Sequence, residues 1–159
     1  MNNSTENYSL ELRLRITGFE CSPKEIVKII GVEPTKLSVK GQPFSDRTKA
    51  VSKQNAWRLD SPASGTNSSV AEQIRALEQV LNPFVDRFNN LPKESKVKLS
   101  MVVYAYRYFP PIYFSLEDLE FIIKIGASLE FDIYDLVEEA GDSAESPTQP
   151  SQKFSSESQ

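Results

Sequence analysis

Ten residues near the amino terminus, Tyr8 to Thr17, alternate between apolar and polar side chains. Aliphatic residues occupy the even positions and charged residues the odd ones: Leu10, Leu12, Leu14 and Ile16 against Glu11, Arg13 and Arg15. A period of two is typical of a β-strand with one buried and one solvated face. It predicts an open, mostly antiparallel sheet, because the strands of a parallel sheet covered on both faces are apolar throughout.

Other segments of the chain repeat this pattern. They are Ala56–Leu59 with Trp57 and Leu59 inward, Val97–Tyr106 with the odd positions inward, Ser128–Tyr134, and a short strand at Leu37 and Val39. In Ser128–Tyr134 we expect Leu129, Phe131 and Ile133 to be buried and Glu130, Asp132 and Tyr134 to be exposed.

Three helices are predicted from their end signals. The first helix has the capping box Ser22–Glu25 and ends at Gly31, and the second has the capping box Ser69–Glu72. The third helix begins at Ser115 and ends at Gly126. Its apolar side consists of Leu119, Ile122 and Ile125. The apolar spacing of the second helix continues to Asn89 across Pro83, which removes a backbone donor. Pro83 therefore either kinks this helix or divides it, and the sequence leaves both open.

Each helix has one apolar stripe and each long strand one apolar face, so two layers bury both. We predict an α+β fold: a two-layer sandwich of a mostly antiparallel, twisted sheet of about four to five strands, with helices packed on one face. We divide the chain into a flexible amino terminus at 1–7, a single domain at 8–136 and a disordered acidic tail at 137–159, where almost no residue is apolar. The order of the strands stays open.

The residue inventory excludes several kinds of catalysis. The chain has no histidine and one cysteine, Cys21, which removes histidine-based triads, histidine-ligated zinc and cysteine-rich zinc sites. No two glycines lie close enough for a phosphate loop, and the acids Glu117, Asp118 and Glu120 do not converge on one ion. We therefore assign no catalytic residue, metal or cofactor, and expect no enzyme. A free cysteine and no apparent signal or membrane segment favour the cytoplasm.

Charge is distributed unevenly along the chain. The formal net charge of -4 resides after residue 136, and the first 136 residues balance to zero, so we expect neither a nucleic-acid nor a membrane binder. Along the chain, residues 36–58 are basic, whereas residues 108–145, which extend into the tail, carry ten acids and one base. An acidic surface favours a protein partner with a positively charged surface.

Two parts of the chain carry a family resemblance. They are the run Gly31-Val32-Glu33-Pro34-Thr35 with Lys40-Gly41 and Trp57, and the run from Ile125 to Tyr134, IGASLEFDIY. In this order they resemble the bacterial family known as domain of unknown function 4279, over roughly Leu10 to Leu136. The resemblance implies a small cytoplasmic protein with no established activity, cofactor or catalytic residues. Small acidic α+β proteins are also similar to immunity proteins of bacterial toxin loci.

The candidate binding face is the side of the sheet that the helices leave open. Its members are Arg13, Arg15, Arg58, Tyr104, Tyr106, Asp132 and Tyr134, with Glu11, Asp60 and Glu130 beside them. Arginine and tyrosine are enriched at interface hot spots because they combine apolar area with directional hydrogen bonds. An ordinary solvated face with ion pairs is the alternative.

The leading hypothesis is a non-enzymatic binding protein, such as an immunity protein, an inhibitor or a regulatory module, with a protein as its partner. The alternative is a small-molecule sensor, or an enzyme that uses carboxylates and arginines, with a pocket around Arg13, Arg58 and Asp132. A third possibility is weak nucleic-acid binding through the basic residues 36–58, which would depend strongly on salt. The oligomeric state stays open.

Overall fold

The structure, a computed structural model, describes residues 7–45, 47 and 49–136. The amino-terminal residues 1–6 and the predicted tail at 137–159 lie outside the described residues. The elements are β1 (Tyr8–Thr17), α1 (Pro23–Ile30), β2 (Lys36–Ser38), β3 (Ala56–Asp60), β4 (Gly65–Thr66), α2 (Val70–Leu81), the 3-10 helix η1 (Asn82–Asn90), β5 (Lys96–Ala105), α3 (Leu116–Lys124) and β6 (Ser128–Asp135).

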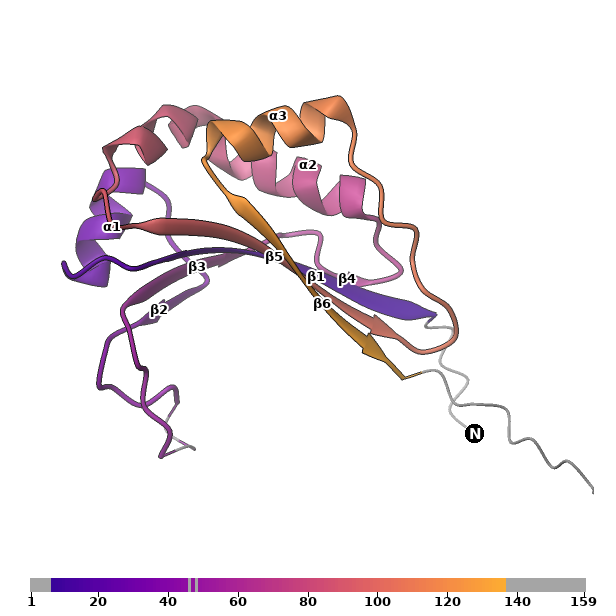
Figure 1. Cartoon of the computed structure of the whole chain (residues 1–159), viewed down its shortest axis with the longest axis horizontal. Helices are drawn as coiled ribbons and strands as arrows, with labels where there is room; N and C mark the ends of the chain where they lie inside the picture. The colour runs from indigo at the N-terminus through magenta and orange to yellow at the C-terminus, as the bar shows by residue number, and fades with distance from the viewer. Residues whose placement is uncertain (1–6, 46, 48, 137–159) are drawn as a thin grey trace, which may run out of the picture.

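The strands form one twisted sheet, and the helices lie on one side of it (Figure 1). The strand order is β2-β3-β1-β5-β6, and the short β4 also pairs with β1. All pairs are antiparallel except β5 and β6, which run parallel. The predicted α+β fold with a mostly antiparallel sheet and one helical layer is therefore confirmed.

The core lies between the helices and the even positions of β1. Leu10, Leu12, Leu14 and Ile16 are fully buried, as is Trp57 of β3. Register places Leu14 between Leu59 of β3 and Leu99 of β5, so the inward residues of three strands meet the helices together.

Capping chemistry sets the helix starts, with one correction. Ser69 and Glu72 form the predicted capping box of α2, and Ser115 forms one with Asp118 in α3. Ser22 caps α1 by accepting from the backbone N–H of Lys24, and the predicted box with Glu25 does not form. At Pro83 the α-helical pattern changes to 3-10 geometry, so the apolar stripe continues through a second, tighter helix.

The prediction that the inward side of β6 is buried is wrong. Leu129, Phe131 and Ile133 are 37%, 42% and 51% exposed, and Leu119 of α3 is also exposed. Each strand of a sheet is rotated relative to its neighbour. This twist carries β6 diagonally out from beneath α3, so none of the described helices covers its second half (Figure 1).

Candidate binding face

The structure places most of the predicted face residues on the side of the sheet away from the helices. Arg13 and Arg15 lie on β1, Arg58 on β3, Tyr104 on β5, and Asp132 and Tyr134 on β6, each at a position that alternates with inward residues. Tyr106 lies beyond the end of β5, so the alternation of side chains along this strand does not determine on which face of the sheet Tyr106 lies.

Register brings four cations into one row across this face. Lys36 of β2 pairs with Arg58 of β3, Arg58 with Arg15 of β1, and Arg15 with Lys98 of β5. Neighbouring strands lie about 4.8 Å apart, so the row is about 14 Å long. We call these four residues the cation row. The alternation of residues 97–106 predicts that Lys98 lies on this face, but it was not among the candidate residues, and the position of Lys36 was not predicted. Only the strand register brings both lysines into line with Arg15.

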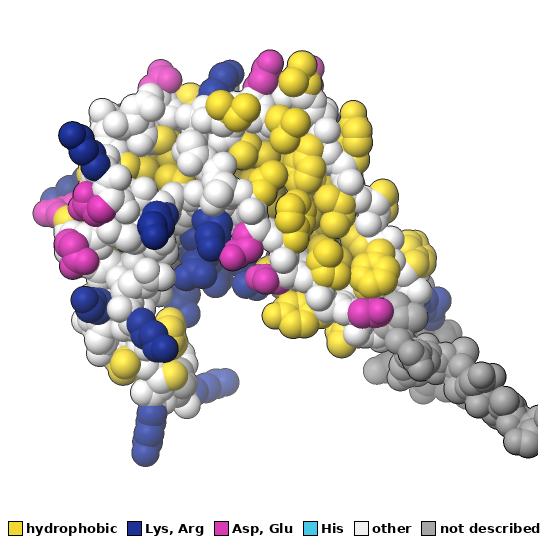
Figure 2. All heavy atoms as spheres, viewed as in Figure 1, with side chains coloured by type: hydrophobic (Ala, Val, Ile, Leu, Met, Phe, Trp, Pro, Cys, Tyr) yellow, Lys and Arg dark blue, Asp and Glu magenta, His cyan; other side chains and the backbone are white. Residues whose placement is uncertain are grey.

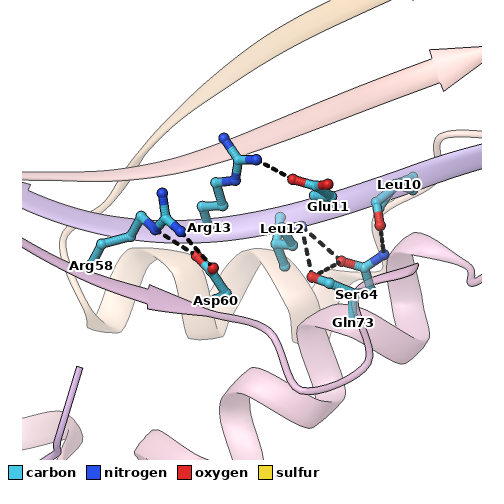
Figure 3. Close-up of polar contacts among 8 residues, drawn as sticks. All are labelled: Leu10, Glu11, Leu12, Arg13, Arg58, Asp60, Ser64 and Gln73. Carbon is cyan, nitrogen blue, oxygen red and sulfur yellow. Dashed lines mark hydrogen bonds and ion pairs between the residues drawn. The ribbon is translucent and has the colours of Figure 1, made fainter. Parts of the chain in front are cut away.

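Carboxylates two positions away hold two of the arginines. The guanidinium of Arg58 contacts the carboxylate of Asp60 through two atom pairs, Nε to Oδ1 and Nη2 to Oδ2, both at 2.9 Å. Arg13 pairs with Glu11 through a single contact, from Nη2 to Oε2. Both arginines lie on the face of β1 and β3 away from α2 (Figure 3). Among the described residues, no carboxylate lies within ion-pair distance of Arg15.

A trough follows the cationic half of the face. Three adjoining hollows form it: one of about 360 Å³ at Arg13, Arg58 and Asp60, one of about 170 Å³ at the cation row, and one of about 280 Å³ beside residues 50–54. The described part of the β2–β3 connection, residues 39–45, 47 and 49–55, projects from the sheet on this side and is called the arm (Figure 1). Figure 2 shows Lys and Arg side chains gathered in the concavity beneath the sheet.

The half of the face over β5 and β6 differs in chemistry. The rings of Tyr104 and Tyr134 stack with centroids 5.1 Å apart. Lys98 donates to Glu130 at 3.0 Å, and hydrogen bonds from Lys98 and Ser100 lower the pKa of the Glu130 carboxyl below its usual value. The predicted association of Arg13 and Arg58 in one hollow is seen, but Asp132 does not line it.

A second feature is an apolar surface that sequence analysis did not predict. It combines the uncovered side of β6 with the outer side of α3 and the connection before it: Tyr108, Phe109, Ile112, Tyr113, Leu116, Leu119, Ile123, Leu129, Phe131 and Ile133. We call it the β6–α3 surface, and Figure 2 shows its hydrophobic side chains in contact with one another. The sequence of α3 does contain a signal for this surface: Leu116 and Ile123 are apolar but lie outside the buried stripe of the helix.

Beneath the trough, the fully buried Gln73 of α2 fastens β1 where its neighbour changes from β3 to β4. Its side chain accepts from the N–H of Leu12 at 2.8 Å and donates to the carbonyl of Leu10 at 2.5 Å (Figure 3). Ser64 also donates to its Oε1 at 3.1 Å. Gln73 thereby fixes the strand segment that carries Glu11 and Arg13.

Other chemistry is limited within the part of the chain that the structure describes. No cluster of three or more acidic or cysteine residues could hold a metal ion there. No helix in the described ranges is long and apolar enough to cross a membrane. Burial, followed by a hydrogen bond to Glu25, raises the pKa of the Cys21 thiol, which opposes formation of a nucleophilic thiolate.

The fold and this face define a two-layer α+β domain with one face of its sheet left open. The chain belongs to the family described as domain of unknown function 4279, which matches residues 6–136. The match covers every helix and strand described above. Searches of the curated proteins and of the solved structures returned no significant match.

Proposed function

We propose that this protein is a non-enzymatic binding module that docks an extended segment of a partner protein along the free edge of β6. The observation that carries the proposal is the β6–α3 surface, which lies open beside that edge. Monomeric soluble proteins rarely expose contiguous apolar patches larger than about a few hundred Å², and larger patches mark interaction sites.

The backbone of β6 supplies the second half of the interaction. Among the residues that the structure describes, β6 is the last strand of the sheet and pairs only with β5. Its outer edge therefore presents N–H and C=O groups to which an extended peptide can add as a further strand. Backbone hydrogen bonds would give affinity, and the side chains on the two faces would give specificity.

The side chains of β6 specify the chemistry of the partner. On the helix side they are apolar, and on the open side Glu130 and Asp132 are acidic. An added strand alternates in the same way, so the complementary segment alternates apolar and basic residues. A second copy of β6 fits poorly, because antiparallel pairing would place carboxylates opposite carboxylates.

The acidity of the neighbouring elements supports a positively charged partner. Residues 108–136 contain six acids and one base, Lys124. Such a surface speeds the encounter with a cationic protein. The specific role that fits this proposal is an immunity or inhibitor protein that covers the cationic site of a toxin. A reducing cytoplasm suits this role, since Cys21 is a free thiol.

The test uses a defined peptide of eight residues, the length of β6, that alternates valine and lysine. The control peptide alternates valine and glutamate. We expect the lysine peptide to bind with an affinity that falls as salt rises and to slow amide hydrogen exchange in Ser128–Asp135. Binding of both peptides alike, or protection confined to other elements, would contradict the proposal.

A pair of matched variants tests the apolar contribution. The double substitution Leu129→Thr and Ile133→Thr removes aliphatic surface from β6, whereas Val39→Thr and Val51→Thr remove it from the arm. The two pairs are comparably exposed, at 37% and 51% against 37% and 48%. We expect the β6 variant to bind the lysine peptide about tenfold more weakly and the arm variant to bind it normally. Equal losses in both variants would refute docking on β6.

A further inference from the structure

The cation row is only partly neutralised: Arg58 pairs with Asp60 and Lys98 with Glu130, whereas Arg15 and Lys36 have no ion pair with a described carboxylate. Like charges directly opposite each other on neighbouring strands repel, and here Lys36, Arg58, Arg15 and Lys98 form three such pairs in succession. An anion that lies across the row attracts each of these cations and offsets the repulsion between them. We propose that the trough at the cation row binds a small organic polyphosphate, with its phosphates on the row and its aromatic ring against Phe44.

The charge balance of the trough supports an anionic ligand. The described residues that line it include five cations (Arg13, Arg15, Lys36, Lys53 and Arg58) and two carboxylates (Glu11 and Asp60). Each carboxylate is already paired, with Arg13 and Arg58 respectively. Arg15 and Lys36 therefore supply positive charge that no carboxylate among residues 7–45, 47 and 49–136 neutralises through an ion pair.

The arginines are also held in place before a ligand arrives. A hydrogen bond from Nη2 and an ion-pair contact from Nε restrain the guanidinium of Arg58 against Asp60, and Glu11 restrains Arg13. A planar guanidinium presents paired N–H donors that match the oxygens of a phosphate. Because these side chains are already ordered, binding costs less conformational entropy.

Phe44 of the arm distinguishes an organic polyphosphate from an inorganic one. Its ring is 45% exposed, lines the hollow at the cation row, and lies 5.7 Å from the Nζ of Lys36. Backbone hydrogen bonds hold this part of the arm, from the N–H of Phe44 to the carbonyl of Ala50 at 3.0 Å and from the N–H of Ser52 to the carbonyl of Gln42 at 2.8 Å. An aromatic ring joined to the phosphates can therefore stack on Phe44.

The borders of the row favour a small ligand over a nucleic-acid strand. Beyond Lys98 the row continues to the uncharged Ser128, and the adjacent row carries carboxylates at both ends, Asp60 and Glu130, with Arg13 between them. A long phosphodiester backbone would meet these carboxylates, whereas two or three phosphates fit within the row, which is about 14 Å long.

The test is calorimetric titration of the full chain with inorganic pyrophosphate, adenosine diphosphate and adenosine. We expect both phosphate compounds to bind, with affinities that fall as salt rises, and adenosine alone not to bind. Phe44→Ala should weaken adenosine diphosphate about tenfold and leave pyrophosphate unchanged. Failure of both phosphate compounds to bind, or tighter binding of a twelve-residue oligothymidylate than of adenosine diphosphate, would overturn the proposal.

Charge-matched variants locate the site. Arg15→Gln removes one cation from the row, and Arg75→Gln removes one from the exposed side of α2. We expect Arg15→Gln to weaken pyrophosphate binding tenfold or more and Arg75→Gln to leave it unchanged, since only Arg15 lies on the row. Equal losses would mean that overall charge, and not the row, attracts the anion.

Two further measurements separate this proposal from other outcomes. Without ligand, Arg15→Gln should melt at the same temperature as the wild type or higher, because it relieves repulsion; a large decrease would contradict the cost assigned to the row. The double variant Leu129→Thr and Ile133→Thr should bind pyrophosphate normally, so the anion site can fail or succeed independently of docking on β6.

Discussion

Replacing the buried glutamine Gln73 by leucine tests how the strand that carries Glu11 and Arg13 is held. Leucine has a similar size but neither accepts from the N–H of Leu12 nor donates to the carbonyl of Leu10. The N–H of Leu12 retains only a longer contact with Ser64, at 3.3 Å. The substitution therefore removes a hydrogen bond from each of two buried backbone groups: the N–H of Leu12 keeps only the Ser64 contact, and the carbonyl of Leu10 keeps only its pairing with Gly65 of β4.

The expected loss follows from these two groups. A buried polar group deprived of its partner costs about 1–3 kcal/mol. Two such groups, offset by the added apolar surface of leucine, give a loss of about 3 kcal/mol. For a domain of this size, the loss corresponds to a decrease in melting temperature of about 10 °C.

The assay is urea denaturation followed by the fluorescence of Trp57, the single and fully buried tryptophan. Gln79→Leu is the matched control, because Gln79 is an exposed glutamine of the same helix. We expect the control to change the free energy of unfolding by less than about 0.5 kcal/mol. If Gln73→Leu costs less than about 1 kcal/mol, as little as a single hydrogen bond, then Gln73 does not fasten β1.

The variant Gln73→Glu adds a pH dependence to this test. A buried carboxylate accepts from Leu12 but cannot donate to Leu10, and burial raises the pKa of a carboxyl above its unfolded value. Such a group lowers the free energy of unfolding at every pH above the unfolded pKa. This loss of stability becomes smaller as the pH falls, because the carboxyl becomes protonated and can donate to the carbonyl of Leu10. A deficit that stays constant between neutral and mildly acid pH would refute this assignment of donor and acceptor.

Other substitutions give single expected outcomes. Gly18→Ala should cost about 2 kcal/mol or more in urea denaturation, because φ is +81° and a Cβ would lie 2.6 Å from the carbonyl oxygen of Glu94. Ser69→Ala should cost about 1 kcal/mol at neutral pH. Hydrogen bonds from Ser69 lower the pKa of the Glu72 carboxyl, so the stability from this pair should be lost as the pH falls through that lowered pKa, which equilibrium melts across acid pH would show. Iodoacetamide should alkylate Cys21 more slowly than free cysteine at pH 7, because burial raises the pKa of its thiol, and urea should remove the difference.

Features that depend on local chemistry could be predicted from the sequence. The alternation in β1 identified both faces of the central strand. The capping box at Ser69 and the serine at Ser115 correctly marked the starts of α2 and α3. At Ser22 the same reasoning failed, because the Ser22 hydroxyl accepts from the N–H of Lys24, and the N–H of Glu25 donates to the Ser22 carbonyl instead. Gln73 also had a local signal, since it follows Val70 by three residues on the apolar stripe of α2.

Features that depend on neighbours could not be predicted in this way. Alternation correctly placed Leu129, Phe131 and Ile133 on the inward side of β6, but burial also requires a covering layer, and the twist of the sheet moves β6 away from α3. Pro83 shows the same limit. Its missing donor predicted an interruption, while the 3-10 continuation depends on how α2 and η1 pack together.

The cation row shows why the chemistry of an open sheet face is hidden in its sequence. Arg15 is flanked along its own strand by Arg13 and Thr17, but across the sheet it faces Arg58 and Lys98, which are distant in the chain. If β3 paired with β1 one residue out of this register, Arg58 would lie on the inward face of the sheet and would no longer belong to the cation row. The inward residues Leu59 and Trp57 exclude that shift, because it would expose them. The apolar core therefore determines the register, and through the register it determines which charges meet on the opposite face.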